Sequence, residues 1–273
     1  MRFWLALVLL LTIVVPARAA DFYFYASDGA RLHYTETGPA NAPFLLFVPG
    51  WTMPGWIFTP QLRAFSKRYR VVLFDPRGQG SSEITSTGYN QDRRGEDIGE
   101  LVDLLPGKVV VIGWSLGVLD TLAWIHQGGS AKLAGLVFID NSVGETPAPL
   151  PQRGPYRQPT MPEFVREMFH TSPTQAYLAR LTAACERLPK PYAEELLRYP
   201  VPRSYWKVAI LSTDVPVLYV VRPHLQGQAN NLLIDRPNTT IAVFRNAGHA
   251  LFVDDATRFD ALMQQFLDND ARL

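Results

Sequence analysis

Gly113-Trp114-Ser115-Leu116-Gly117 is the stretch of this 273-residue sequence that decides its fold. An unbroken apolar run at residues 109–112 precedes it, and residues 116–127 after it read as a helix. A serine on a sharp turn between a strand and a helix is presented as a nucleophile at the edge of a sheet. Small neighbours fit such a turn, because backbones pass too close for large side chains. A chance pattern in a glycine-rich turn is the alternative, and the strand and helix disfavour it.

Further apolar runs lie on both sides of this stretch. They cover residues 44–48, 71–74, 136–139, 217–221 and 240–244. Strands this apolar are buried on both faces, which is typical of a parallel sheet covered by helices. Helices are predicted over residues 59–69, 93–105, 116–127 and 256–269, and an N-terminal hairpin over 22–25 and 31–35. The pattern predicts an α/β fold with a doubly wound, mostly parallel sheet.

The alternation of strands and helices stops between Asn141 and about Thr213. Residues 147–162 are rich in proline, and helical stretches follow at 163–170, 174–187 and 192–198. We predict that residues 143–205 are a helical cap inserted into a core of residues 20–142 and 206–273. It would cover the carboxyl edge of the sheet, where open α/β sheets bind ligands. A separate domain is the alternative, but one of this size is marginal alone.

The first 19 residues differ in kind from the rest. Arg2 gives a positive start, residues 3–15 are almost wholly apolar, and Ala17-Arg18-Ala19 has the small-x-small pattern of a signal-peptidase site. The apolar run is too short to span a bilayer comfortably, since a transmembrane helix needs roughly 20 residues. We therefore predict a signal peptide at 1–19, a periplasmic or secreted protein, and no stable membrane insertion after cleavage. An uncleaved anchor is the alternative.

Composition argues against several kinds of partner. The net charge is +1 and the densest basic run is Arg93-Arg94, so no nucleic-acid partner is predicted. Cys185 is the only cysteine, which excludes an intramolecular disulfide and favours a buried structural thiol. The His and Cys residues are too scattered for a metal-ligand spacing, so neither a metal nor another cofactor is predicted.

A serine hydroxyl is a weak nucleophile at neutral pH and needs an adjacent base. His249 follows the last predicted strand in Ala247-Gly248-His249-Ala250, so the nucleophile precedes the histidine along the chain. The other histidines fall in the hairpin, the helix after Ser115, the cap and a loop: His33, His126, His170 and His224. These four read as structural or exposed, and His249 is the predicted general base.

The negative charge that develops on an attacked carbonyl oxygen needs two preorganised N–H donors. We predict the backbone amides of Leu116, directly after Ser115, and of Trp51, in the loop after residues 44–48. A plain strand-to-helix turn is the alternative for that loop. Trp114, Met53 and Trp56 are expected to line an apolar substrate pocket, although core packing explains such residues as well.

From about Phe22 to Leu267 the chain resembles the α/β-hydrolase superfamily, in the branch of small esterases and cofactor-free haloperoxidase-like enzymes. The motifs that carry the resemblance are Asp75-Pro76-Arg77-Gly78-Gln79-Gly80-Ser81-Ser82, similar to D-x-R-G-x-G-x-S, the turn Ala247-Gly248-His249, and the Gly-x-Ser-x-Gly stretch. The resemblance implies the fold and the nucleophile class but little about substrate. One departure is Pro49-Gly50, where the family usually has His-Gly.

A second departure concerns the acid that orients the histidine. In the family it usually follows the strand predicted here at 217–221, but this sequence continues with Arg222-Pro223-His224, without a carboxylate. Some relatives, haloalkane dehalogenases among them, supply the acid from the position of Asp140, which ends the strand after the nucleophile helix. Asp140 is therefore the predicted acid, and a turn or capping aspartate is its alternative. Glu145, Asp235, or a Ser–His dyad without an acid also stay open.

These residues predict a serine hydrolase that cleaves a small, apolar carboxylic ester, lactone or thioester through an acyl-enzyme. A serine at position 115 argues against epoxide hydrolase and dehalogenase activity. By resemblance, the enzymes of this fold with those activities have an Asp at the nucleophile position. An acyltransferase or a perhydrolase would use the same residues. A non-catalytic binding protein that keeps the fold is the alternative of another class.

Overall fold

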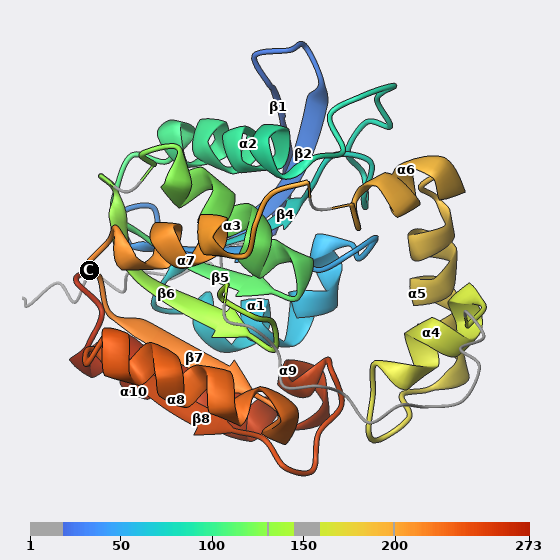
Figure 1. Cartoon of the computed structure of the whole chain (residues 1–273). Helices are drawn as coiled ribbons and strands as arrows, with labels where there is room; N and C mark the ends of the chain where they lie inside the picture. The colour runs from blue at the N-terminus through green and yellow to red at the C-terminus, as the bar shows by residue number, and fades with distance from the viewer. Residues whose placement is uncertain (1–18, 130, 145–158, 199) are drawn as a thin grey trace, which may run out of the picture.

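The computed structural model describes residues 19–129, 131–144, 159–198 and 200–273. In these residues eight strands form one sheet in the order β1-β2-β4-β3-β5-β6-β7-β8 (Figure 1). The strands are β1 (Ala20–Tyr25), β2 (Arg31–Thr37), β3 (Phe44–Val48), β4 (Arg70–Asp75), β5 (Val109–Trp114), β6 (Leu133–Ile139), β7 (Val217–Val221) and β8 (Thr239–Val243). β2 is antiparallel to β1 and β4, and all other pairs are parallel. The predicted doubly wound α/β fold is confirmed.

Helices cover both faces of the sheet. The elements on one face are α2 (Gln91–Leu104), α3 (Leu116–His126), α7 (Ser204–Leu211) and α8 (Gln226–Asp235). On the other face lie η1 (Gly55–Phe58), α1 (Thr59–Phe65), α9 (Leu251–Asp254) and α10 (Ala256–Asn269). Within β5, Val109 and Val111 pack into the first core cluster, while Val110 and Ile112 pack into the second. This two-sided burial explains why the strand reads as an unbroken apolar run.

The segment predicted as a cap contains α4 (Met161–Glu167), α5 (Gln175–Glu186) and α6 (Lys190–Glu195), which stand together beside the sheet in Figure 1. They contact loops at the carboxyl ends of the strands. The Ala250 amide donates to the Met168 carbonyl over 2.8 Å, and Arg187 Nη2 donates to the Ser82 carbonyl over 2.7 Å. The cap therefore adjoins the edge of the sheet at which Ser115 was expected.

Three helices depart from the sequence expectation. Neither α7, α8 nor the four-residue α9 is predicted, and α7 packs against α3 as part of the core layer. α8 carries Gly227, Asn230 and Asn231, and only a few of its residues are buried. Its apolar periodicity is too weak to be recognised, because packing against the sheet rather than local pattern stabilises it.

The predicted signal peptide lies almost wholly outside the described residues, as do the proline-rich part of the cap and the alternative acid Glu145. Export and cleavage stay predictions. In the part of the chain that the structure describes, no helix has the length and apolar character needed to cross a bilayer.

The register of the central strands determines which loops meet. Val48 pairs with Gly113, Trp114 with Ile139, and Ile139 with Val220. Parallel strands paired this way end at one edge of the sheet. The loops that follow β3, β5, β6 and β7 therefore lie side by side.

Candidate active site

Ser115 occupies the turn between β5 and α3 with φ 54° and ψ −120°. This left-handed conformation is rare for a residue with a side chain. A Cβ on Gly117 would lie 2.3 Å from the Val48 carbonyl oxygen, and one on Gly113 would lie 2.7 Å from the Gly117 carbonyl oxygen. The Ser115 carbonyl accepts from Asn141 Nδ2 over 2.7 Å. Glycine flanks and a fixed carbonyl thus hold the serine in a strained turn.

His249 lies against Ser115, as the sequence predicts. Its Nε2 is 2.8 Å from Ser115 Oγ, and its Nδ1 is 2.6 Å from Asp140 Oδ2. The Trp114 indole N–H donates to the His249 carbonyl over 2.9 Å and holds the loop in place. Because an ionised carboxylate only accepts, Nδ1 carries the proton and Nε2 is left to accept from the serine hydroxyl. That is the tautomer a general base requires.

Asp140 is the carboxylate that the structure brings to His249. Its side chain is fully buried, and besides His249 it accepts from the Arg222 backbone amide over 2.9 Å and from Arg222 Nε over 2.6 Å. Burial alone would raise the pKa of Asp140. The hydrogen bond from His249, with the positive charges of His249 and Arg222, outweighs burial and lowers this pKa below its ordinary value. The carboxylate is therefore charged throughout the neutral range.

The other predicted candidates lie elsewhere. Asp235, at the end of α8, pairs with Lys207 over 2.9 Å. His33 binds Asp75 through Nδ1 over 2.7 Å, and His126 stacks on Tyr205. His170 and His224 are exposed. Among the histidines, only His249 lies within hydrogen-bonding distance of Ser115 in the described residues.

The predicted oxyanion donors flank Ser115. Leu116 is the first residue of α3, so its N–H has no acceptor within the helix. On the other side, Gly50 approaches so closely that a Cβ there would lie 2.9 Å from Ser115 Cβ. Trp51 follows Gly50 directly, which puts its amide in the same loop beside the serine. Their role as donors to an oxyanion stays a proposal.

A buried glutamine fixes the loop that carries the Trp51 amide. Gln79 Nε2 donates to the Gly50 carbonyl over 3.0 Å and to the Met53 carbonyl over 2.7 Å. Gln79 Oε1 in turn accepts from Arg94, which pairs with Asp120 in the core. In a trans peptide the C=O and N–H point in opposite directions. Holding the Gly50 carbonyl therefore also orients the Trp51 N–H.

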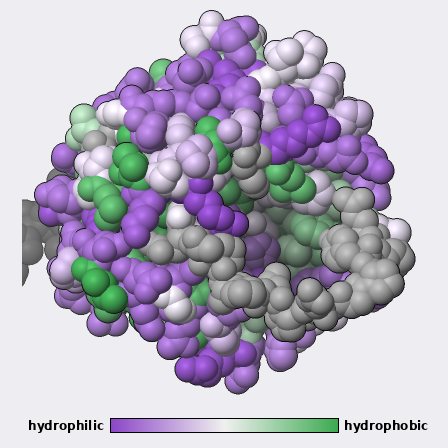
Figure 2. All heavy atoms as spheres, viewed as in Figure 1, coloured by the Kyte–Doolittle hydropathy of each residue, from purple (hydrophilic) through white to green (hydrophobic). Residues whose placement is uncertain are grey.

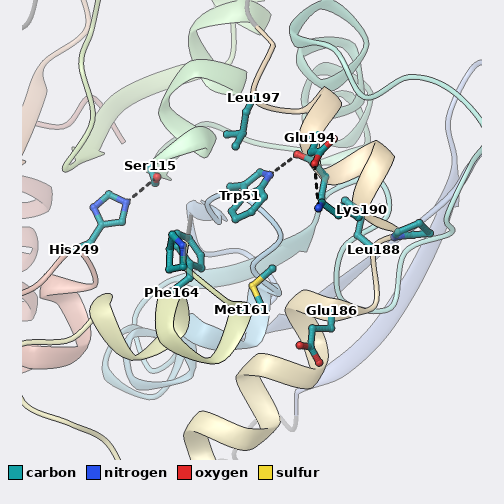
Figure 3. Close-up of a pocket in the computed structure, with 13 residues that line it drawn as sticks. Trp51, Ser115, Met161, Phe164, Glu186, Leu188, Lys190, Glu194, Leu197 and His249 are labelled. Atoms are coloured by element: carbon teal, nitrogen blue, oxygen red, sulfur yellow. Dashed lines mark hydrogen bonds and ion pairs between the residues drawn. The ribbon is translucent and has the colours of Figure 1, made fainter. Parts of the chain in front are cut away.

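A cavity of about 560 Å³ opens beside Ser115 and His249. In Figure 3 these two residues lie at one end, Lys190 and Glu194 at the other, and the Trp51 ring between them. Its walls are mainly apolar and come largely from the cap: Met161, Phe164, Leu188, Pro189, Ala193 and Leu197. Figure 2 shows hydrophobic side chains around a hollow on this side of the molecule. An apolar substrate of moderate size fits such a cavity.

The prediction that Trp114, Met53 and Trp56 line the substrate pocket is wrong, because none of them lines the cavity. Trp114 is almost fully buried and packs in the core against Phe58 and Phe252. Met53 is equally buried, with its sulfur 3.6 Å from the Cys185 sulfur. Trp56 stacks edge-on against Tyr177 outside the cavity lining. Their expected place beside the active-site loops did not reveal which way these side chains point.

Two parts of the site were missed from the sequence. The apolar lining belongs to the cap helices, and Trp51 contributes its ring as well as its amide, with Nε1 donating to the Ala193 carbonyl over 2.6 Å. The second is Arg222, whose position in the sequence indicated only that no carboxylate follows the strand over residues 217–221.

The described residues contain no group of three His, Cys, Asp or Glu side chains that could hold a metal ion.

A family model described as "Alpha/beta hydrolase family" matches residues 45–262. The chain is 30% identical over 115 residues to a non-heme chloroperoxidase from Streptomyces lividans, covering 41% of this chain and 42% of that protein. It is 32% identical over 119 residues to a bifunctional esterase/perhydrolase from Acinetobacter calcoaceticus, covering 43% of each. These matches span less than half the length of either relative.

The fold extends further than the sequence similarity. The structure superposes on an esterase from Exiguobacterium antarcticum with a TM-score of 0.75, covering 90% of this chain and 99% of that one. The two sequences are 17% identical over this superposition. At that identity the likeness shows the shared fold alone.

Proposed function

The chain belongs to the alpha/beta hydrolase family, and we propose that it hydrolyses carboxylic esters or lactones with Ser115 as the nucleophile. The observation that carries the proposal is the relay of hydrogen bonds from Ser115 Oγ to His249 and on to Asp140, at the mouth of an apolar cavity. The esterase/perhydrolase among its relatives supports an ester-cleaving activity.

In the first half of the reaction, Ser115 Oγ attacks the carbonyl carbon while His249 Nε2 takes its proton. The charge that gathers on the carbonyl oxygen is stabilised by the amides of Trp51 and Leu116. The imidazolium is stabilised by the Asp140 carboxylate, 2.6 Å from Nδ1. When the C–O bond to the alcohol breaks, His249 returns the proton to the leaving oxygen, and the acyl group stays on Ser115.

In the second half, water replaces the alcohol. His249 takes a proton from the water as its oxygen attacks the acyl carbon, and the same two amides stabilise the charge. The bond to Ser115 Oγ then breaks, and His249 returns the proton to the serine. Because both halves use one base and one oxyanion site, a single set of positioned groups serves the whole cycle.

The cavity determines the substrate class in this proposal. Trp51, Phe164 and Leu188 present apolar surface to the cavity that Ser115 and His249 also line. An aryl or medium-chain apolar group would bury its surface there, at roughly 25 cal/mol for each Å² removed from water. A small, strongly polar ester would gain little from these walls.

The proposal is tested by hydrolysis of p-nitrophenyl acetate and butyrate. We expect the butyrate ester to have the higher kcat/KM, and Ser115→Ala and His249→Gln to abolish turnover by the folded protein. Ser212→Ala, at the end of α7, is the matched control. Turnover that survives Ser115→Ala would refute the nucleophile, and a folded wild type inactive on every ester and lactone tried would refute the function.

A further inference from the structure

A chain of buried polar side chains leads from the core to the loop after β3. Its members are Asp120 on α3, Arg94 on α2 and Gln79 after β4, and each has at most 2% of its surface exposed. Asp120 Oδ2 accepts from Arg94 Nε over 2.9 Å and from Arg94 Nη2 over 2.5 Å. Arg94 Nη1 donates to Gln79 Oε1 over 3.2 Å. Asp120 therefore turns the planar guanidinium so that its remaining nitrogen faces Gln79.

The contacts of Gln79 allow only one orientation of its amide. On one side lies Arg94, which has only donors. On the other side lie the carbonyl oxygens of Gly50 and Met53, which can only accept. Reversing the amide would set donor against donor and acceptor against acceptor. Arg94 therefore keeps Oε1 on its own side and directs the N–H groups of Nε2 to the loop.

The two carbonyls lie on either side of a strained residue. Thr52 has φ 56°, a left-handed conformation that its surroundings must enforce. The carbonyls held by Gln79 belong to Gly50 and Met53, and the Met53 amide also donates to the Gly50 carbonyl over 3.1 Å. The Trp51 N–H, the proposed oxyanion donor, belongs to the same turn. Gln79 thus bridges the turn, and it can do so only while its amide keeps this orientation.

We propose that Arg94, held by its ion pair with Asp120, is a positioning residue of the active site. It fixes the Gln79 amide, and through that amide it fixes the turn that presents the Trp51 N–H to the substrate carbonyl. For its catalytic meaning the inference rests on the proposed function. Its structural content, the hold on the turn, can be measured without turnover.

The test removes the ion pair and the glutamine separately and together. Arg94→Met combined with Asp120→Leu replaces the pair by apolar side chains, so that no buried charge loses its partner. Arg94→Lys is a second variant, because it keeps the charge beside Asp120 but lacks the planar fork that directs another nitrogen at Gln79. Arg236→Met is the matched control, since Arg236 is buried and donates to the Val215 carbonyl over 2.6 Å, near the amino end of β7.

Two quantities are measured for each variant. Steady-state kinetics with p-nitrophenyl butyrate give kcat and KM, and hydrogen–deuterium exchange followed by NMR gives the exchange rate of the Met53 amide. We expect both Arg94 variants to lower kcat about fivefold with little change in KM, and to speed Met53 exchange by about the same factor. In the Gln79→Leu background they should cause no further loss of kcat, because Arg94 acts only through Gln79.

Arg236→Met should keep the wild-type kcat and the wild-type Met53 exchange rate. Unchanged kcat and Met53 exchange in the folded Arg94 variants overturn the proposal. An equal further loss of kcat in the Gln79→Leu background overturns it as well, because Arg94 would then act by another route. Faster Met53 exchange in the Arg94 variants of a protein without esterase activity supports the positioning role and refutes the proposed function alone.

Discussion

At the scale of single residues, backbone strain gathers at one place. Among the described residues, the non-glycine residues with positive φ are Thr52 at 56°, Ser115 at 54° and Asp140 at 51°. They follow β3, β5 and β6, whose carboxyl ends are neighbours in the sheet. Left-handed backbone is costly for residues with side chains and persists where the surroundings enforce it. Here it places Ser115 and Asp140 within hydrogen-bonding distance of the same histidine, His249.

Substituting Asp140 tests the acid directly. Asp140→Asn keeps the shape of the side chain but removes the charge that stabilises the imidazolium and selects its tautomer. We expect kcat/KM to fall by about 10² to 10⁴ with the fold intact by circular dichroism. The matched control Asp235→Asn, which alters only the surface pair with Lys207, should keep wild-type activity. A loss of less than threefold in Asp140→Asn would move the acid role elsewhere.

The sequence predicts the places of some of these site residues and not of others. Ser115 and His249 were predictable because close backbone packing requires glycines beside them, and those glycines mark the turns. Asp140 was one of several carboxylates in contention, since sequence shows that it ends a strand but not what it faces. Arg222 could not be assigned a role, because its contact with Asp140 depends on the pairing of β6 with β7 across the sheet.

At the scale of elements, the site depends on how loops are held to the sheet and to the cap. The loop after β3 is held by two side-chain hydrogen bonds. Gln79 Nε2 donates to the Gly50 carbonyl, and Trp51 Nε1 donates to the Ala193 carbonyl on α6. This double attachment fixes the predicted oxyanion donor, and it couples the cap to the catalytic loop.

Removing the hydrogen bonds from Gln79 should lower both the free energy of unfolding and kcat. Gln79→Leu leaves the buried Gly50 and Met53 carbonyls without the side-chain donor, which costs about 1–3 kcal/mol of unfolding free energy. We expect kcat to fall at least tenfold while KM changes little, because a displaced Trp51 amide weakens only the transition state. Urea denaturation and steady-state kinetics measure the two effects. Gln127→Leu, on an exposed bond to the Asp92 carbonyl, is the control. Unchanged kcat would contradict this role.

Phe164, which lines the cavity, should affect substrate binding more than kcat. Phe164, on α4, meets the Trp51 ring edge-on at 5.0 Å. Phe164→Ala removes apolar wall, and we expect KM for p-nitrophenyl butyrate to rise by about tenfold with a smaller change in kcat, on the scale of a lost aromatic contact. Phe22→Ala, on exposed β1, is the comparison. Equal kinetics of both variants would exclude Phe164 from the binding surface.

Strands were easier to predict than helices and loops. All the apolar runs became strands of the sheet. For β3, β5, β6 and β7 the reason is complete burial, because a strand buried on both faces is apolar throughout. The cap helices were placed within a few residues, but the side chains that line the cavity were not, since that depends on how α4 to α6 sit over Ser115. Such packing has no local signature in sequence.

At the scale of the whole molecule, buried ion pairs tie the sheet together and make its stability depend on pH. His33, on β2, binds Asp75 at the end of β4 and lies 3.3 Å from exposed Asp21. Burial lowers the pKa of His33, but the hydrogen bond and charge of Asp75, with a screened contribution from Asp21, outweigh it and raise this pKa above its ordinary value. The protonated histidine therefore stabilises the folded state.

The sign of this linkage is fixed by the raised pKa. The contribution of His33 is fully present below the unfolded-state value of about 6.5, and it is lost as pH rises through the folded-state value. We expect the free energy of unfolding to fall between pH 6 and the alkaline side of neutrality. His33→Gln, which keeps a donor but cannot titrate, should flatten that part of the profile. A variant with the same pH dependence as the wild type would show that other groups cause it.

The central claim, that Ser115 is the nucleophile, is tested most directly by covalent labelling with a fluorophosphonate. The reagent forms a phosphorus–oxygen bond to an activated serine and loses fluoride, so intact mass and peptide mapping show which residue reacted. We predict a single adduct on the peptide containing Ser115 in the wild type and in Ser212→Ala, none in Ser115→Ala, and strongly slowed labelling in His249→Gln. An adduct of equal yield in Ser115→Ala, or a folded wild type that is never labelled, would contradict the account.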